Sequence, residues 1–270
     1  MQADGRTTTI AALRCTTQGS QTQPLELIGE EPLLIRIESR PYAVVMRTPG
    51  EELFHAAGFC LSEGLVDAAD DFATIGHCQD MDTNVVDIRL TPGRLDKVQG
   101  LLERKGFVSQ TSCGICGKQM LEDMHQVVTP ATSGFSIAVS QMLHAINTLA
   151  DCQQYYQRTR GSHAAVLIDA QLQVLAFAED VGRHNALDKA IGKALMSGKL
   201  ACARILVLSS RISYELIQKA ARAHLPVIIS HSRPTALAAA MGKDLNMTLA
   251  FPVGPSELIV VCGENRVAWT

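Results

Sequence analysis

The sequence predicts an α/β protein whose amino-terminal part is a small α+β unit. From about residue 136, strand-sized apolar runs alternate with segments of helical periodicity, which is typical of a layered mixed sheet. Residues 205–208 are apolar at every position, as expected of a strand that is covered on both faces. With 47% hydrophobic and 19% charged residues, the 270-residue chain can bury a sizeable core.

The amino-terminal half divides into a polar beginning and the small α+β unit. Residues 1–24 are rich in Thr, Gln, Gly and Ser and show little apolar periodicity, so we expect a flexible tail. Residues 25–108 form the α+β unit. Thr48 is expected to cap a helix with Pro49 in its first turn, and Pro92 to start a second helix. The predicted strands are 33–37, 42–47, 72–77 and 85–90.

Residues 109–135 are predicted to be a loop and linker, because small polar residues and glycines dominate them. Residues 136–270 then form the second α/β unit, and Ser140 is expected to cap its first helix. The predicted strands of this unit are 164–168, 172–177, 205–208, 227–229, 248–251 and 258–261. Its further helices are expected at 185–196, 213–223 and 235–243.

Charge and hydropathy argue against several classes of partner. The chain has 24 Lys and Arg against 27 Asp and Glu, a net charge of −3, so its overall field favours neither nucleic acid nor an anionic membrane. No run approaches the ~20 apolar residues of a membrane helix. The first residues lack a basic start followed by an apolar core, so we expect a cytoplasmic protein with reduced thiols.

Cys113 and Cys116 form a C-x-x-C pair within the segment CGICGK. Such a pair fits half of a structural zinc site, a thioredoxin-like redox pair, or a reactive thiol that carries sulfur or an acyl group. Zinc would need a second pair or histidines at matching spacing, which the sequence lacks, so we expect no structural metal. The carrier interpretation has a physical basis, because Lys118 lies close in sequence to promote the thiolate and the flanking glycines let the segment move between donor and acceptor. A pair of inert loop cysteines is the remaining alternative.

A second group of functional residues is the string EDVGRHNALDK at 179–189, which follows a predicted strand and opens a predicted helix. A helix N-terminus carries unpaired N–H groups and partial positive charge, which suit a phosphate. Arg183 adds a guanidinium, and His184 can hydrogen-bond or transfer a proton. The alternative is a plain helix cap in which Asp180 and Asn185 satisfy backbone donors. The succession Gly-Arg-His-Asn favours a ligand site.

Polar residues also stand at the ends of other predicted strands. His163 precedes the strand 164–168, Ser210 and Arg211 follow 205–208, and His231 follows 227–229. In open α/β sheets, ligands bind in the crevice beyond the carboxyl ends of the strands. We therefore expect these side chains to line one crevice with Arg183 and His184.

These motifs resemble those of the FdhD family, the sulfur carrier proteins that formate dehydrogenase requires. The resemblance rests on the C-G-x-C-G pair at 113–117 followed by EDVGRHNALDK at 179–189. Supporting matches are GFCLSEG at 58–64, HAA at 163–165 and SSRISYE at 209–215. The resemblance runs in order from about residue 25 to the end of the sequence.

The resemblance implies a cytidine-deaminase-like fold for residues 136–270 and a homodimer. It implies that Cys113 receives sulfur from a cysteine desulfurase as a persulfide, which Cys116 assists or protects. The sulfur then passes to the molybdenum cofactor in its bis(molybdopterin guanine dinucleotide) form, before the formate dehydrogenase apoenzyme receives it. A guanine nucleotide is expected to mimic this ligand. The family's cofactor-binding stretch falls on the late turn, at Pro252, Val253, Gly254, Pro255, Ser256 and Glu257. The strand-end residues His163, Arg183, His184, Ser210 and Arg211 are expected to bind the cofactor with it.

Two positions depart from the family pattern. The late turn commonly ends in Arg, but here it ends in Glu257, whose carboxylate would repel a phosphate. The approach to His163 contains Arg160, which stands where it could supply the missing cation. Zinc deaminase chemistry is not expected, because no Glu lies two residues after His163. The alternative functions are a cofactor-binding chaperone for formate dehydrogenase without sulfur transfer and a zinc-stabilised binding module.

Overall fold

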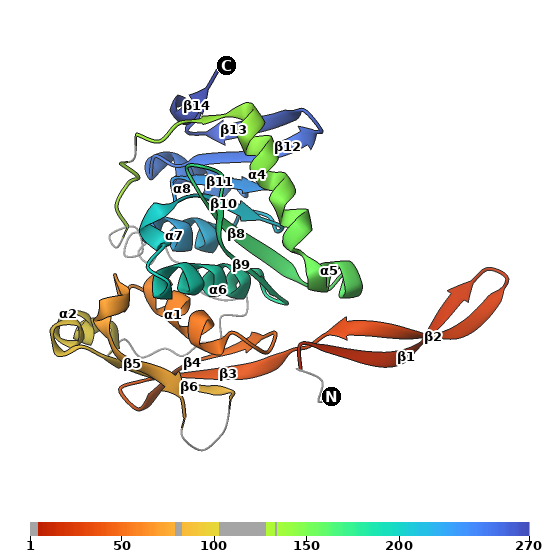
Figure 1. Ribbon diagram of the computed structural model, residues 1–270, viewed down its shortest axis with the longest axis horizontal. Coiled ribbons are helices and arrows are strands. Elements are labelled where there is room, and N and C mark those ends of the chain that lie inside the picture. The colour runs from red at the N-terminus through yellow and green to blue at the C-terminus, as the bar shows by residue number, and fades with distance from the viewer. Residues whose placement is uncertain (1–4, 79–82, 103–127, 133, 270) are drawn as a thin grey trace.

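The computed structural model describes residues 5–78, 83–102, 128–132 and 134–269. Helices and mixed sheets confirm the predicted α/β class (Figure 1). The helices are α1 (Glu52–Ser62), α2 (Pro92–Leu102), α4 (Val139–Cys152), α5 (Gln154–Thr159), α6 (Arg183–Met196), α7 (Tyr214–Arg222) and α8 (Ala236–Asp244). The strands are β1 (Thr7–Thr16), β2 (Gly19–Ile28), β3 (Glu31–Ile37), β4 (Arg40–Arg47), β5 (Phe72–His77), β6 (Val85–Leu90), β7 (Ile137–Ala138), β8 (His163–Asp169), β9 (Val174–Asp180), β10 (Ala203–Leu208), β11 (Val227–Ser230), β12 (Thr248–Gly254), β13 (Glu257–Cys262) and β14 (Val267–Ala268).

The carboxyl-terminal part is a six-stranded sheet between two layers of helices. The strand order is β13-β12-β11-β10-β8-β9, with β10, β11 and β12 parallel and the other pairings antiparallel. Ile205 and Val207 of β10 pack in one core cluster with α4, whereas Leu206 and Leu208 pack in the other with α6, α7 and α8. The layered mixed sheet is as predicted, while its likeness to cytidine deaminases stays a prediction.

A four-stranded sheet with the order β4-β3-β6-β5 forms the amino-terminal unit. Its strands agree with those expected from alternating apolar residues, and its inner face is covered by α1 and α2 (Figure 1). Leu33, Ile35, Val86 and Ile88 fill this face and are fully buried. One core cluster contains these side chains together with those beneath α6 and α7, so the two units share a hydrophobic core.

The two units meet where α1 crosses α6, and glycine permits the close approach. A Cβ atom at Gly58 would lie 1.8 Å from the carbonyl oxygen of Asp188, and one at Gly192 would lie 1.8 Å from that of Phe54. A larger side chain at either position would force the helix backbones apart. The glycines therefore set the spacing between the amino-terminal unit and the sheet that carries the candidate site.

The expectation of a flexible tail at residues 1–24 is wrong for the described part of that segment. Residues 7–28 form an antiparallel hairpin, β1–β2, which projects from the body (Figure 1). Its register runs from Thr7 opposite Ile28 to Thr16 opposite Gly19. Threonine is a good strand former, and this property outweighs the polar composition from which a tail was expected.

Two predicted helix caps are also wrong. The first helix begins at Glu52, and Thr48 instead lies buried between the units, where its hydroxyl accepts a hydrogen bond from the Val181 N–H at 3.0 Å. The helix expected at Ser140 begins at Val139, and the Gln141 side chain accepts a hydrogen bond from the Ala138 N–H. Residues 109–127 of the predicted loop, with Cys113 and Cys116, lie outside the described residues.

None of the helices in the described part of the chain is long and apolar enough to cross a membrane.

Candidate functional site

Four strand ends meet at one edge of the six-stranded sheet. His163 at the start of β8 lies opposite Asp180 at the end of β9, and Leu208 at the end of β10 aligns with Ser230 at the end of β11. The antiparallel pairing of β8 with β10 places the start of β8 beside the end of β10. The segments that the sequence analysis expected at one crevice therefore converge at the place where open α/β sheets bind ligands.

A cavity of about 380 Å³ opens at this edge. His163, Ser209 and His231 line it from the sheet, while Tyr156 and Arg160 line it from α5 and the turn after it. The Arg160 guanidinium lies over the Tyr156 ring, 5.1 Å from its centroid. The cavity thus combines hydrogen-bonding groups with a cation and an aromatic ring, and its volume is within the range of small-molecule sites.

His163 is held by the loop after β10. Its Nδ1 lies 3.4 Å from the Ser209 hydroxyl, which also accepts a hydrogen bond from the Ala164 N–H at 2.8 Å. Burial lowers the pKa of His163 below its usual value, and the nearby side chains of Arg183 and His184 lower it further. Burial also lowers the pKa of His231. Both imidazoles are therefore neutral at pH 7, so each can donate one hydrogen bond and accept another.

Arg183 and His184 begin α6 close enough to His163 to affect its pKa, but neither is among the side chains that line the cavity. The Arg183 Nε atom is buried and has no hydrogen-bond partner among the described residues. The N-cap residue Gly182 has no side chain to bond the first N–H groups of the helix, which leaves them for an anion. The Arg183 Nε without a partner and the helix start without a side-chain cap both favour a phosphate at this position.

His184 points instead towards α7. Its Nε2 lies 2.9 Å from Oε2 of Glu215, which also accepts a hydrogen bond from the Ser213 hydroxyl at 3.2 Å. The hydrogen bond from His184 lowers the pKa of Glu215 to about 2, so this carboxylate is ionised at neutral pH. The pair fixes the orientation of the His184 imidazole against Glu215.

Asp180 is a structural residue, in agreement with the helix-cap alternative. It is fully buried and accepts hydrogen bonds from the N–H groups of Thr48 and Gly182 and from the Asn185 side chain, at 2.8–3.0 Å. The Lys189 ammonium lies 2.7 Å from its Oδ2. These partners occupy both carboxylate oxygens. Within the motif, Asp180, Asn185 and Lys189 therefore join the units, whereas Arg183 begins α6 and His184 points towards α7.

Ser210 and Arg211 differ from each other in the structure. Ser210 is buried, its hydroxyl donates to the Arg211 carbonyl at 3.1 Å, and its own carbonyl accepts from the Ser230 hydroxyl. Arg211 is exposed. Ser210 therefore shapes the loop, while its neighbour Ser209 contacts His163.

The late turn is the tip of the β12–β13 hairpin. Gly254 pairs with Glu257 across it, and β12 reaches past the end of β11 on the same side of the sheet as the cavity. The side chains that line the cavity do not include those at 252–257, and Glu257 is exposed. A cofactor-binding role for Pro252, Val253, Gly254, Pro255, Ser256 and Glu257 stays a prediction.

Sequence reasoning did not select Tyr156, because a single helix was expected from residue 140. The structure starts the separate helix α5 at Gln154, and Tyr156 and Arg160 reach the cavity from it. Among the described residues, no three His, Cys, Asp or Glu side chains gather as metal ligands would.

Comparison with known proteins places these features in a family. The FdhD/NarQ family matches residues 28–268. A "Sulfur carrier protein FdhD" of Streptomyces avermitilis is 35% identical over 257 residues, which cover 92% of this chain and 90% of that protein. The protein of the same name from Mycobacterium tuberculosis is 37% identical over 248 residues, covering 87% and 89%.

A solved structure has the same fold. The crystal structure of a putative formate dehydrogenase accessory protein from Desulfotalea psychrophila superimposes with a TM-score of 0.77 at 21% identity, covering 97% of this chain and 99% of that one. Together with the match over residues 28–268, these findings show that the chain belongs to the FdhD/NarQ family.

Proposed function

We propose that the protein is a sulfur carrier that serves formate dehydrogenase. Cys113 takes a sulfane sulfur from a cysteine desulfurase, and the acceptor is the molybdenum cofactor in its bis(molybdopterin guanine dinucleotide) form. One observation carries this proposal. A member of the FdhD/NarQ family combines the C-G-x-C-G thiol pair with a sheet edge whose polar strand ends and helix start suit a phosphate. The proposal includes a homodimer and the formate dehydrogenase apoenzyme as a partner.

Loading is an exchange between thiols. The Cys113 thiolate attacks the outer sulfur of the persulfide on the desulfurase, a new S–S bond forms, and the desulfurase cysteine leaves as a thiolate. No net oxidation occurs, because one persulfide replaces another. Lys118 stabilises the attacking thiolate by its charge.

Delivery at the oxidation level of sulfide requires two electrons. Cys116 can supply them: its thiolate attacks the inner sulfur of the Cys113 persulfide, a Cys113–Cys116 disulfide forms, and hydrosulfide leaves. A cellular thiol then reduces the disulfide. This role gives the second cysteine of the pair a chemical purpose.

The acceptor cofactor binds in the cavity through one of its nucleotide portions. A cavity of about 380 Å³ suits one nucleotide portion of the cofactor, with phosphates at the start of α6 near Arg183 and the base near the Arg160–Tyr156 stack. The buried, unpartnered Nε of Arg183 supports this fit. The Glu257 carboxylate would repel phosphates at the late turn, whereas Arg160 supplies a cation inside the cavity.

Substituting Arg183 tests the acceptor site. We expect Arg183→Ala to weaken guanosine diphosphate binding about tenfold or more, since a charge-assisted hydrogen bond contributes about 1.5–3 kcal/mol. Arg204→Ala is the matched control, because Arg204 lies at the opposite end of β10 and its Nη1 donates to the Ala201 carbonyl. Isothermal titration calorimetry of both variants gives the comparison. Equal affinities of Arg183→Ala and the wild-type protein for guanosine diphosphate would contradict phosphate binding at this edge of the sheet.

Intact mass spectrometry tests the carrier itself. After incubation with a cysteine desulfurase and cysteine, we expect a gain of one or more sulfur atoms that is reversed by reductant and maps to Cys113. Cys113→Ala is expected to lose both this gain and the activation of formate dehydrogenase while keeping nucleotide affinity. If the wild-type protein gains no sulfur from a donor that loads another acceptor, the cofactor chaperone without sulfur transfer becomes the better description.

A further inference from the structure

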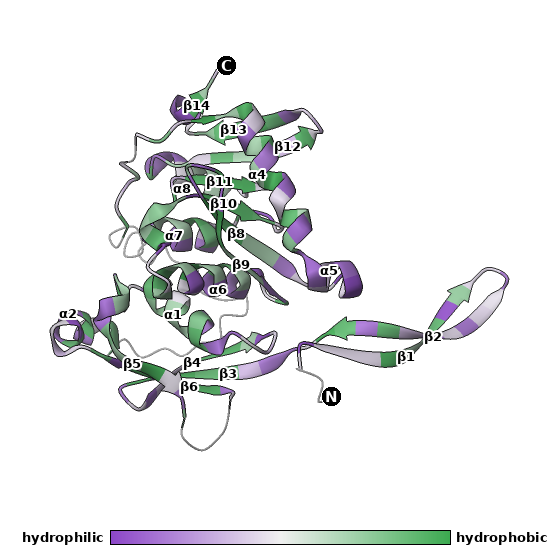
Figure 2. Cartoon of the chain, in the orientation of Figure 1, coloured by the Kyte–Doolittle hydropathy of each residue, from purple (hydrophilic) through white to green (hydrophobic). Residues whose placement is uncertain are grey.

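Residues 153–163 supply most of the cavity wall, although hydrophobic packing does not hold them in place. All the lining residues except Ser209 and His231 belong to this segment. Its helix, α5, is six residues long, and none of them is buried. Figure 2 shows this helix as hydrophilic along its length. Contacts other than core packing must therefore fix the positions of Tyr156 and Arg160.

The Glu179 carboxylate on β9 holds the segment at both ends. The side chain is buried, at 6% exposure. Its Oε2 accepts a hydrogen bond from the Tyr155 N–H and its Oε1 accepts one from the Tyr156 N–H, both at 2.8 Å. These N–H groups belong to the first turn of α5, where the N-cap residue Gln153 provides no side-chain hydrogen bond. Oε1 also accepts a hydrogen bond at 2.8 Å from the hydroxyl of Ser162, which follows the helix.

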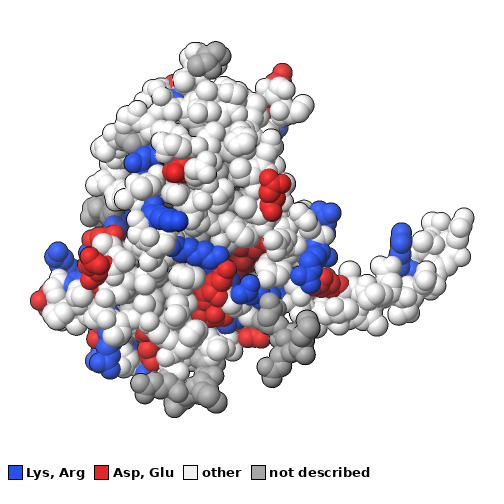
Figure 3. All heavy atoms as spheres, in the orientation of Figure 1, with Lys and Arg blue, Asp and Glu red and all other residues white. Residues whose placement is uncertain are grey.

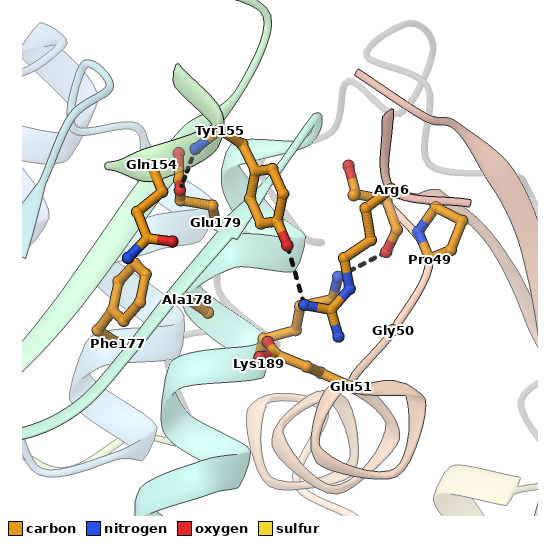
Figure 4. Close-up of a pocket in the computed structure, with 11 residues that line it drawn as sticks. Arg6, Pro49, Gly50, Glu51, Gln154, Tyr155, Phe177, Ala178, Glu179 and Lys189 are labelled. Atoms are coloured by element: carbon orange, nitrogen blue, oxygen red, sulfur yellow. Dashed lines mark hydrogen bonds between the residues drawn. The ribbon is translucent and has the colours of Figure 1, made fainter. Parts of the chain in front are cut away.

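Two further contacts attach α5 to the β1–β2 hairpin. Figure 4 shows Tyr155 between Glu179 and Arg6, which donates a hydrogen bond to the Tyr155 hydroxyl at 3.0 Å. Arg158 of α5 forms an ion pair with Glu26 of β2. Figure 3 shows positive and negative side chains next to each other at the base of the hairpin. Because this ion pair is exposed to water, it holds the helix less firmly than the buried carboxylate of Glu179 does.

Arg160 has a backbone conformation that is unfavourable for its residue type. Its φ of 55° lies in the left-handed region, where glycine is preferred. The guanidinium nevertheless lies over the Tyr156 ring in the cavity wall. Such strain persists only where surrounding contacts compensate for it, and it is common at ligand sites. The hydrogen bonds of Glu179 on either side of Arg160 are contacts of this kind.

We propose that Glu179 is a positioning residue for the nucleotide cavity, because its carboxylate holds α5 with the Tyr156 ring and the Arg160 guanidinium towards the ligand. This inference rests on the nucleotide binding of the proposed function and adds a residue to it. Glu179 is not among the side chains that line the cavity, so it acts through Tyr156 and Arg160. Without its carboxylate, the ligand would have to order the segment on binding, and this cost lowers affinity.

Isothermal titration calorimetry with guanosine diphosphate tests the role of Glu179. We expect Glu179→Ala to weaken binding about tenfold, because the ligand must then immobilise the wall of its own site. Glu179→Gln keeps one acceptor oxygen and should have an intermediate affinity. Glu26→Gln is the matched control, since it makes the same change at the exposed partner of Arg158 on the same helix. It should alter the affinity by about twofold or less.

A double-mutant cycle separates positioning from a general loss of structure. We expect Glu179→Ala combined with Tyr156→Ala to bind little more weakly than the weaker of the two single variants, because both remove the same contact with the ligand. Independent effects would multiply. Hydrogen exchange of the nucleotide-free protein should be faster at the Tyr155 and Tyr156 amides in Glu179→Ala, while the amides of α6 keep their protection.

Three results would overturn the positioning role: equal affinities of Glu179→Ala and the wild-type protein, effects that multiply in the cycle, or unchanged exchange at the α5 amides. A wild-type protein that binds no guanosine diphosphate would instead contradict the acceptor site of the proposed function. The exchange of the α5 amides would then still decide whether Glu179 holds the helix, so the two proposals fail separately.

Discussion

Gly58→Ala is expected to lower the free energy of unfolding by about 3 kcal/mol, the upper range for overpacking a tight contact. The added methyl would lie 1.8 Å from the Asp188 carbonyl oxygen, and helix backbones cannot yield as a flexible side chain can. α1 and α6 would have to separate, which disturbs the shared core and the start of α6 at the candidate site. Urea denaturation, or the soluble yield if the variant does not fold, measures the effect.

Gly100→Ala is the control for this experiment. Gly100 lies on the exposed side of α2, and a Cβ there would meet nothing within 4 Å. Alanine is the better helix former, so we expect a gain of about 0.5–1 kcal/mol. Similar stabilities for Gly58→Ala and the wild-type protein would show that the two helices are not locked at this crossing.

Lys189→Met is expected to cost about 3 kcal/mol, because it leaves the Asp180 carboxylate in the core without its cation. The Lys189 ammonium is buried, lies 2.7 Å from Asp180 and also donates to the Thr48 carbonyl at 2.7 Å. Its removal leaves the Asp180 carboxylate and the Thr48 carbonyl in the core without this hydrogen-bond donor. Thermal and urea unfolding at pH 7 measure the loss.

Lys193→Met, one turn further along α6, is the matched control. Lys193 pairs with Glu51 at 2.7 Å but is partly exposed, so water replaces much of what is lost and we expect about 1 kcal/mol or less. Adding Asp180→Asn to Lys189→Met should recover part of the stability, since it removes the unpaired charge. An equal cost for the two lysines would mean that the Asp180–Lys189 pair does not hold the units together.

The failed predictions have identifiable causes. The β1–β2 hairpin was not predicted because its strands carry polar residues on much of both faces. A segment of that composition, without a core of its own, resembles a flexible tail in the sequence. Thr48 and Pro49 carry the chemistry of a helix start, but the buried Asp180 captures the Thr48 N–H at 3.0 Å and the helix begins four residues later, at Glu52. For Thr48 a partner distant in sequence decides the local structure, whereas the two strands of the hairpin pair with each other.

The sequence by itself determined the α/β class, most strands and helices of both units, and the segments that converge at the candidate site. It could do so because apolar periodicity and turn residues act locally, and because polar strand ends in an α/β sheet share an edge. Only the tertiary structure decided the roles within EDVGRHNALDK, where burial pairs Asp180 with Lys189 and leaves the Arg183 Nε without a hydrogen-bond partner among the described residues. Burial and pairing depend on which distant segments meet, such as Gly58 against Gly192, and no local pattern encodes that contact.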